Sequence, residues 1–314
     1  MAENINILDG AGFARLFGTD AEDIERQCGP LLRAYNFSYR IVGGADWEET
    51  VLRVLKTIDD SPLSASGKDR YEDWERGWGD NLREYEARNY DLVALVPKYM
   101  HKFPVRRLFS HYIEPLDKDF EVNFYTVYRH YLFKTYLAPY DPVYEFGCGT
   151  GYNLVIMARI FPGKRLFGLD WSLNSVKFVD TISQSLELPN LKGRHFDYFS
   201  PDYALEIPPG AAITTLNSLE QLGGDYGNFL EFMLRKKPAL CINSEPFLEM
   251  YNEDKLLDYL AAKYHRRRNY LRGYLPAIKE LAAAGRIEIL KEQRVESGNL
   301  FHEGYSFIVW RPSR

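Results

Sequence analysis

A glycine-rich turn in the middle of the chain is the clearest chemical signal in the sequence. Gly147, Gly149 and Gly151 alternate with other residues directly after the apolar run 143–146. Glycines in such a turn permit positive φ and let the backbone approach a ligand closely at a helix N-terminus. The dinucleotide fingerprint needs its third glycine at the sixth position of the turn, where this sequence has Tyr152. The turn therefore predicts a ligand site and disfavours NAD and FAD.

Carboxylates and aromatic residues follow the next two predicted strands. Asp170 ends one strand and is followed by Trp171, and Asp197 and Tyr198 follow the other. Ligands of open α/β folds bind at the carboxyl ends of parallel strands. We expect Asp170 to accept hydrogen bonds from vicinal hydroxyls, with Trp171 or Tyr198 over a flat ring. A helix cap is the alternative for Asp170, and a turn acid is the alternative for Asp197.

The elements that must position these residues alternate along the second half of the chain. Such alternation favours right-handed βαβ units and a parallel sheet. The last two strands are separated by a short connection around Ser297-Gly298-Asn299, which indicates an antiparallel pair. The predicted strands are 144–146, 165–169, one ending at 195–196, 211–216, 239–243, 286–295 and 303–310, and the predicted helices are 153–160, 173–186, 226–236 and 277–284.

The first 120 residues show helical patterns and no strand alternation. Helices are expected at 49–58, 69–88 and 119–137. The predicted fold is therefore α/β, with a seven-stranded, mostly parallel sheet, a terminal antiparallel hairpin, helices on both faces and an N-terminal helical region. The expected domains are residues 1–120, which are helical, and residues 121–314, which form the sheet.

The stretch Glu145-Phe146-Gly147-Cys148-Gly149-Thr150-Gly151 resembles motif I of the class I S-adenosylmethionine-dependent methyltransferases. The resemblance covers roughly residues 121–314 and implies an enzyme with S-adenosylmethionine as its cofactor. It implies that residues 121–314 bind this cofactor and that residues 1–120 form a helical cap that binds the methyl acceptor. It implies that Asp170 holds the ribose hydroxyls and that Asp197 contacts the adenine amino group. The stretch 216–222, which includes Asn217, resembles the leucine-glutamate stretch of this family. The implied cofactor-binding residues are Glu145, Gly147, Gly149, Gly151, Asp170, Trp171, Asp197, Tyr198 and Asn217.

Methyl transfer to a hydroxyl usually needs a general base, whereas transfer to a neutral amine needs little besides deprotonation. Glu220, Glu245, His265 and His302 are the candidate groups after the fourth and fifth predicted strands. Glu245 is favoured because the end of the strand should direct it at the pocket, with a turn residue before Pro246 as the alternative. Glu245 and His265 are taken as the catalytic candidates, and no metal cluster with recognisable spacing occurs.

Two patterns suggest where the methyl acceptor binds. On a helical wheel, Arg267 shares an apolar face with its neighbours, so it could hold a phosphate or carboxylate, with a surface ion pair as the alternative. An aromatic stripe at helical spacing is formed by Tyr71, Trp74, Trp78, Leu82 and Tyr85. Such a stripe forms either core or part of the acceptor pocket wall.

Composition narrows the class of function. Lys and Arg total 39 against 44 Asp and Glu, a net charge of −5, which disfavours a nucleic-acid partner. Neither a signal sequence nor a membrane-spanning run is visible, so the expected location is the cytoplasm with no membrane partner. We therefore expect a methyltransferase of a small polar molecule, sugar-like or anionic. A non-catalytic binding protein and a protein methyltransferase are the alternatives, and the oligomeric state, including a homodimer, is open.

Overall fold

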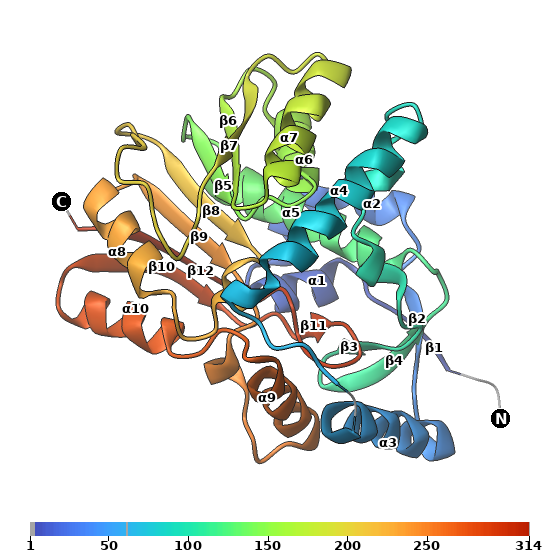
Figure 1. The fold of residues 1–314 in the computed structure, drawn as a ribbon. Helices are drawn as coiled ribbons and strands as arrows, with labels where there is room; N and C mark the ends of the chain where they lie inside the picture. The colour runs from blue at the N-terminus through green and yellow to red at the C-terminus, as the bar shows by residue number, and fades with distance from the viewer. Residues whose placement is uncertain (1–3, 61, 314) are drawn as a thin grey trace.

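The computed structural model describes residues 4–60 and 62–313, and its centre is a seven-stranded sheet (Figure 1). Five consecutive strands, from β9 through β8, β5 and β6 to β7 at one edge, pair in parallel, and β12 pairs antiparallel with both β9 and β10. The predicted α/β class and mixed sheet are therefore confirmed. In spatial order the strands are β10 (Ile287–Gln293), β12 (Phe307–Pro312), β9 (Leu240–Ser244), β8 (Ala212–Leu216), β5 (Val143–Phe146), β6 (Leu166–Asp170) and β7 (Leu191–His195).

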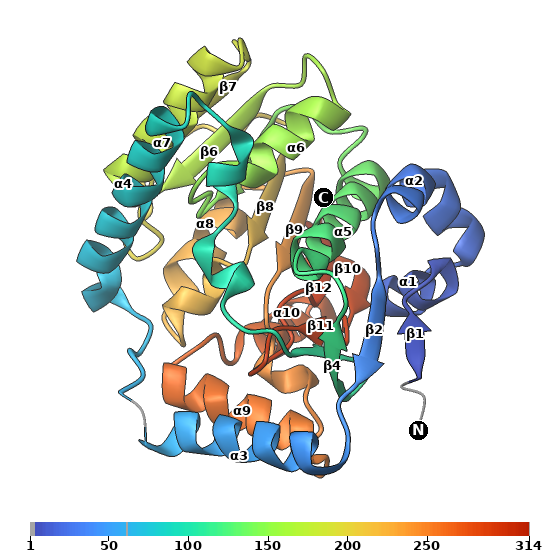
Figure 2. The same ribbon diagram turned by 90° about the vertical axis from the view of Figure 1, so that its right-hand side faces the viewer.

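Both faces of this sheet are buried, because successive side chains along each strand point to opposite faces. Val143 and Ile242 belong to one apolar core, and Tyr144 and Cys241 belong to the other. Helices α5, α6 and α7 pack on the first face, and α8 and α10 pack on the second (Figure 2). These helices are α5 (Phe120–Tyr136), α6 (Tyr152–Ile160), α7 (Leu173–Ser185), α8 (Gly227–Lys236) and α10 (Tyr274–Ala283).

The N-terminal region is mostly helical, as expected, and it also contains a second sheet that was not predicted from the sequence. The strands of this antiparallel sheet are short, and most of them contain polar or charged residues. The sequence therefore showed no alternation of apolar and polar residues there. Its strands are β1 (Ile5–Ile7), β2 (Ser38–Ile41), β4 (His111–Pro115), β3 (Arg106–Leu108) and β11 (Ser297–Gly298). The helices of the N-terminal region are α1 (Gly10–Phe17), α2 (Ala21–Ala34), α3 (Gly44–Asp60) and α4 (Tyr71–Ala87), of which α4 packs against α7.

The connection between β10 and β12 is a long excursion rather than a tight hairpin. Residues 294–306 leave the large sheet, and β11 within them pairs antiparallel with β3 of the small sheet. Helix α9 (Leu256–Arg268) packs beside α3, and both contact this excursion through one apolar cluster (Figure 2). The two ends of the chain thus build one region together, although the sequence suggested separate segments.

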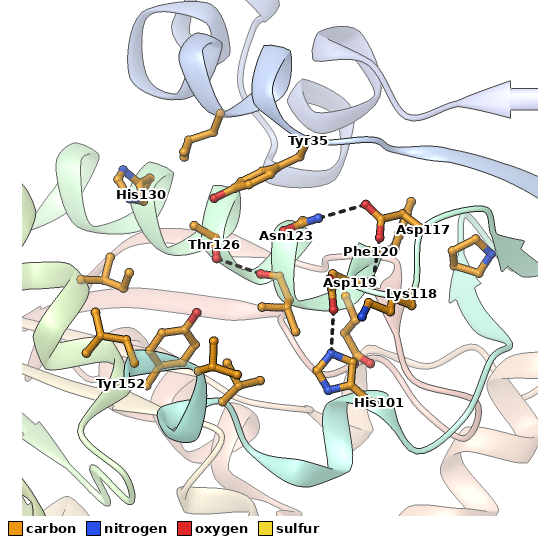
Figure 3. A pocket seen from close by; sticks show the side chains of 18 of the residues that line it. Tyr35, His101, Asp117, Lys118, Asp119, Phe120, Asn123, Thr126, His130 and Tyr152 are labelled. Carbon is orange, nitrogen blue, oxygen red and sulfur yellow. Dashed lines mark hydrogen bonds and ion pairs between the residues drawn. The ribbon is translucent and has the colours of Figure 1, made fainter. Parts of the chain in front are cut away.

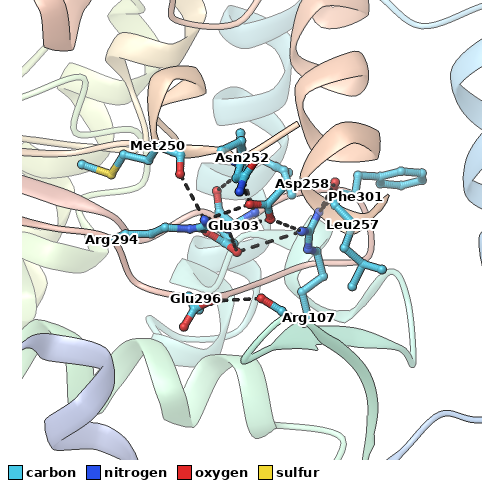
Figure 4. A network of polar contacts seen from close by, with 12 residues as sticks. Arg107, Met250, Asn252, Leu257, Asp258, Arg294, Glu296, Phe301 and Glu303 are labelled. Atoms are coloured by element: carbon cyan, nitrogen blue, oxygen red, sulfur yellow. Dashed lines mark hydrogen bonds and ion pairs between the residues drawn. The ribbon is translucent and has the colours of Figure 1, made fainter. Parts of the chain in front are cut away.

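A buried ion network holds the excursion in place (Figure 4). Arg294 binds Asp258 through both guanidinium Nη atoms (2.9 and 2.6 Å) and binds Glu303 through Nε and Nη2 (both 2.8 Å). Arg107, with 1% of its surface exposed, lies 3.5 Å from Asp258 and donates to the carbonyls of Leu257 and Phe301. Two guanidiniums and two carboxylates therefore join β3, α9 and the excursion with balanced charge.

None of the helices in residues 4–60 and 62–313 is long and apolar enough to cross a lipid bilayer.

Replacing Asp258 by Asn should destabilise the protein strongly, because it leaves two buried guanidiniums facing one carboxylate. Breaking a buried ion pair by removing one partner costs about 3–5 kcal/mol in the free energy of unfolding. The control is Glu288→Gln, which removes the exposed pair with Arg311 and should cost less than about 1 kcal/mol. Urea denaturation of both variants measures the difference. Equal losses would show that the network does not hold this region together.

Candidate active site

The glycine turn lies at the carboxyl edge of the large sheet, between β5 and α6. Gly147, Gly149 and Gly151 have φ values of +69°, +53° and +72°, a region that favours glycine. The backbone N–H groups of Gly147 and Cys148 donate to the carbonyl of Leu169 (2.7 and 3.1 Å). The turn is therefore fixed against the end of β6, the strand that carries Asp170.

Asp170 is held by the turn that it faces. Its Oδ2 accepts from the N–H of Gly149 and its Oδ1 accepts from the N–H of Ser172, both at 2.9 Å. The N-cap of α7 is Ser172, through its hydroxyl, and not Asp170. Asp170 instead braces the glycine turn next to this helix. Burial raises the pKa of Asp170 to about 6. Each carboxylate oxygen retains further accepting capacity for a ligand.

Two cavities meet above this edge of the sheet. A small cavity of about 70 Å³ is lined by Asp170, Trp171 and Tyr198, among others. A larger cavity of about 350 Å³ extends from Gly149 toward α9 and the excursion. Five residues line both cavities, so we treat them as two compartments of one cleft, the ring compartment and the acceptor compartment. The shared residues are Trp74, Trp78, Gly147, Asn217 and Gln221.

The glycines do different jobs. A Cβ on Gly149 would lie 3.0 Å from the ring of Trp78 across the cleft, so this position keeps the cradle open. A Cβ on Gly151 would instead meet Ile182 and Val179 of α7 at 3.2 and 3.3 Å, so Gly151 allows α6 and α7 to pack closely.

Other predicted cofactor residues lie away from the cleft lining. Glu145 is fully buried behind the turn, where its Oε1 accepts from Asn153 (2.6 Å) and burial raises its pKa to about 8. Asp197 forms a turn in which its Oδ1 accepts from the N–H of Phe199 (2.8 Å). Asp197 is thus the turn acid of the alternative interpretation, and Glu145 supports the turn from behind.

The aromatic stripe divides along α4. Leu82 and Tyr85 are buried in the core at its C-terminal half, whereas the half-buried Trp74 and Trp78 stack on each other at 5.3 Å and line both compartments. Tyr71 packs edge-on against the ring of Trp171 at 5.5 Å and so supports the wall from outside. Both interpretations of the stripe therefore hold, each for one half of it.

Helix α4 is attached to α7 by a contact that the sequence did not reveal. Glu75 Oε2 accepts from the hydroxyl of Ser172 (2.6 Å) and from the N–H of Asn174 (3.3 Å). Its backbone carbonyl accepts from the Asn174 side chain (3.0 Å). Helix α4, which we call the lid helix, is thus fixed to the first turn of α7, directly beside Asp170.

The structure places both catalytic candidates away from the cleft lining. The carboxylate of Glu245 accepts from the N–H groups of Ser218 (3.2 Å) and Glu220 (3.3 Å), and burial raises its pKa to about 8. It therefore braces the short helix η4 (Leu219–Leu222). His265 is buried behind His302, with 3.1 Å between its Nε2 and Nδ1 of His302, and only His302 lines the acceptor compartment.

Glu220 is the carboxylate of η4 that lines the acceptor compartment. Its Oε1 accepts from Gln221 (2.8 Å), a residue that also lines the ring compartment. Burial raises the pKa of Glu220 to about 7. At neutral pH this carboxyl group can therefore either accept or donate a proton.

The arginine of α9 that lines the acceptor compartment is Arg268, the residue after the predicted Arg267. Arg267 is exposed, whereas Arg268 lines the acceptor compartment and packs over the rings of Tyr264 and Tyr270. The excursion supplies further wall residues for which no motif exists. These are Gly298, Asn299, Phe301, His302, Gly304 and Tyr305.

A third, more open cavity of about 1470 Å³ lies along α5, next to α2 and α6 (Figure 3). Tyr35, Asn123, Thr126 and His130 line it, and Asn123 donates to Asp117 (3.5 Å). It shares Phe103, Glu121 and Tyr152 with the acceptor compartment.

Among the described residues, no group of three or more His, Cys, Asp and Glu side chains is placed to hold a metal ion.

The sheet order decides the fold family. The last strand, β12, is inserted antiparallel between β10 and β9, and the first parallel strand, β5, leads into the glycine turn. The chain has the class I methyltransferase fold.

No protein-family model matches this chain, and no curated protein matches it in sequence. Solved structures with some likeness to this methyltransferase-type fold include EvdMO1, with 15% identity and a TM-score of 0.40 over 60% of this chain and 41% of that chain. The chain thus spans less than half of EvdMO1. A geranyl diphosphate methyltransferase in complex with SAM has 13% identity and a TM-score of 0.45 over 63% of this chain and 92% of that chain. The magnesium protoporphyrin IX methyltransferase from Synechocystis PCC 6803 has 14% identity and a TM-score of 0.46 over 62% of this chain and 86% of that chain.

Trp78→Ala should lower the free energy of unfolding by about 1–2 kcal/mol, because only part of this half-buried ring is removed from water. Tyr85→Ala on the same helix removes a fully buried ring and should cost about 3–5 kcal/mol. Urea denaturation of the two variants provides the comparison. A loss for Trp78→Ala as large as that for Tyr85→Ala would show that Trp78 belongs to the core.

Proposed function

We propose that this protein transfers the methyl group of S-adenosylmethionine to an oxygen or nitrogen atom of a small polar molecule. The observation that carries the proposal is the position of Asp170 at the end of β6. There Asp170 accepts a hydrogen bond from the N–H of Gly149 in the glycine turn, and it lines a compartment with aromatic walls. A small polar acceptor is supported by the adjoining compartment of about 350 Å³, whose wall combines aromatic rings with charged and amide side chains. A cytoplasmic location is part of the proposal.

The residues present suit the cofactor. Gly149 leaves a cradle that a Cβ would fill, so the backbone can approach an adenosine-sized ligand. In this proposal Asp170 accepts from the two ribose hydroxyls, and Trp171 and Tyr198, which line the same compartment, lie beside the planar base. When bound, S-adenosylmethionine supplies an electrophilic methyl group.

The task of this chain is to align the acceptor and to exclude water. Trp74 and Trp78 stand between the two compartments and line both of them. An acceptor that binds beside these rings therefore lies next to the cofactor site. Glu220 stands in the same wall and can take the proton that a hydroxyl acceptor must lose. An amine acceptor would need less of Glu220, so the proposal covers both oxygen and nitrogen.

Asp170→Ala should weaken the binding of S-adenosylhomocysteine, the demethylated product, at least tenfold. Two hydrogen bonds to a charged acceptor are lost, and each contributes about 1.5–3 kcal/mol. Isothermal titration calorimetry measures the dissociation constant, and melting temperatures confirm that the variant is folded.

Asp197→Ala is the matched control, because Asp197 forms a turn and should leave the affinity unchanged. Wild-type affinity in folded Asp170→Ala would contradict the proposed cofactor site.

A further inference from the structure

The acceptor compartment has three buried N–H donors in its wall that lack a hydrogen-bond partner within residues 4–60 and 62–313. They are Nη1 of Arg70, Nε1 of Trp74 and Nε of Arg268. The unpartnered buried polar atoms of this wall, among the described residues, are all donors. A buried donor without a partner costs about 1–3 kcal/mol, so such a set calls for an explanation.

Two of the three donors are guanidiniums that come from separate segments. Arg70 belongs to η1 (Lys68–Arg70), before the lid helix, and Arg268 is the last residue of α9. The segments are fixed to each other, because the N–H of Ser66 donates to the carbonyl of Arg268 (2.7 Å) and Asn269 donates to the carbonyl of Ser66 (2.9 Å). The hydroxyl of Ser66 also donates to Gln221 (3.0 Å), which lines the cleft.

The two guanidiniums differ in how far their charge is already compensated. Arg70 donates through Nε to Asp73 (2.7 Å), a carboxylate at the surface side of the lid helix. Arg268 packs over the rings of Tyr264 and Tyr270, with its guanidinium carbon 6.0 and 5.0 Å from their centroids. The aromatic rings hold the Arg268 side chain in place while its Nε, which lacks a hydrogen-bond partner among the described residues, stays available to an oxyanion.

The acidic groups in the same wall do not cancel this cationic character. Glu121 is paired with the buried Arg106 (2.8 Å) and accepts from Tyr305 (3.1 Å). Burial raises the pKa of Glu220 to about 7 against the opposing charge of Arg268, so this carboxyl group is partly protonated at neutral pH and compensates Arg268 only in part. Burial lowers the pKa of His302 to about 3, so its imidazole is neutral.

We infer that the acceptor compartment contains an oxyanion subsite, formed by Arg268 with Arg70 and Trp74, so that the methyl acceptor carries a carboxylate or phosphate group. This inference rests on the proposed function in one respect, that the bound molecule is the methyl acceptor. The oxyanion subsite itself does not depend on that function. Guanidinium donors match both oxyanions with paired N–H groups. A neutral sugar offers only weaker acceptors and brings no negative charge to Arg268, the guanidinium of the two that has no ion pair among the described residues.

The test is a titration of the wild-type protein, saturated with S-adenosylhomocysteine, with sodium phosphate and with sodium acetate. Sodium chloride at equal ionic strength is the reference. Calorimetry reports binding, and so does the tryptophan fluorescence, to which Trp74 and Trp78 in the cleft wall contribute. We expect saturable binding of at least one oxyanion and none of chloride, and the stronger of the two oxyanions identifies the group on the acceptor.

Arg268→Gln should weaken that binding at least tenfold and leave the affinity for S-adenosylhomocysteine unchanged. Arg267→Gln is the matched control, because the neighbouring Arg267 is exposed and should bind the oxyanion as the wild type does. Arg268→Lys keeps the charge without the paired donors and should bind with intermediate affinity. If the melting temperature shows that Arg268→Gln is unfolded, Arg70→Gln on the other segment replaces it in the same titration.

The subsite is refuted if neither oxyanion binds the wild type, or if folded Arg268→Gln binds as tightly as the wild type. Failure of the proposed function has a different signature. In that case S-adenosylhomocysteine does not bind, and the oxyanion titration of the protein alone still decides whether the subsite exists.

Discussion

The ion network of Arg107, Asp258, Arg294 and Glu303 joins three segments that are far apart in the sequence. Each of its carboxylates is shared by two guanidiniums, so the charges balance inside the protein. The network fixes the excursion 294–306 against β3 and α9, and the excursion carries much of the acceptor compartment wall. A buried pair of this kind adds little stability by itself, but removal of one member leaves an uncompensated charge. The shape of the acceptor compartment therefore depends on all four charges.

The two compartments of the cleft are built by different physical means. The ring compartment lies at the ends of parallel strands, where backbone N–H groups and Asp170 hold the glycine turn. The acceptor compartment is assembled from the lid helix, α9, the excursion and η4, which are joined by side-chain contacts over long sequence distances. Variation in the second set can thus alter the acceptor while the first set keeps the cofactor site.

The parts of the site that were predictable from sequence are those that depend on local order. Gly147, Gly149, Asp170 and Trp171 each sit at the end of a strand, and the strand pattern alone brings these ends to one edge. The same pattern predicted the parallel strands and the antiparallel pairing of the last two. Glu245 also sits at the end of a strand, but the N–H groups of η4 occupy its carboxylate, which depends on a loop that has no sequence pattern.

The parts that were not predictable depend on tertiary contacts. Arg267 and Arg268 follow Tyr264 by three and four residues, so both lie near the same helix face, and only packing decides that Arg268 turns inward. The small sheet was missed because its strands are only two to five residues long, and because β11 joins it from the other end of the chain. The wall residues of the excursion follow from that pairing and from the ion network, and neither has a local signature.

The most direct test of the central claim is a crystal structure of the protein with S-adenosylhomocysteine. The account predicts that the ribose hydroxyls bind Asp170, that the adenine lies in the compartment lined by Trp171 and Tyr198, and that the sulfur faces the acceptor compartment beside Trp78. A ligand bound elsewhere, or a sulfur directed away from that compartment, would contradict it.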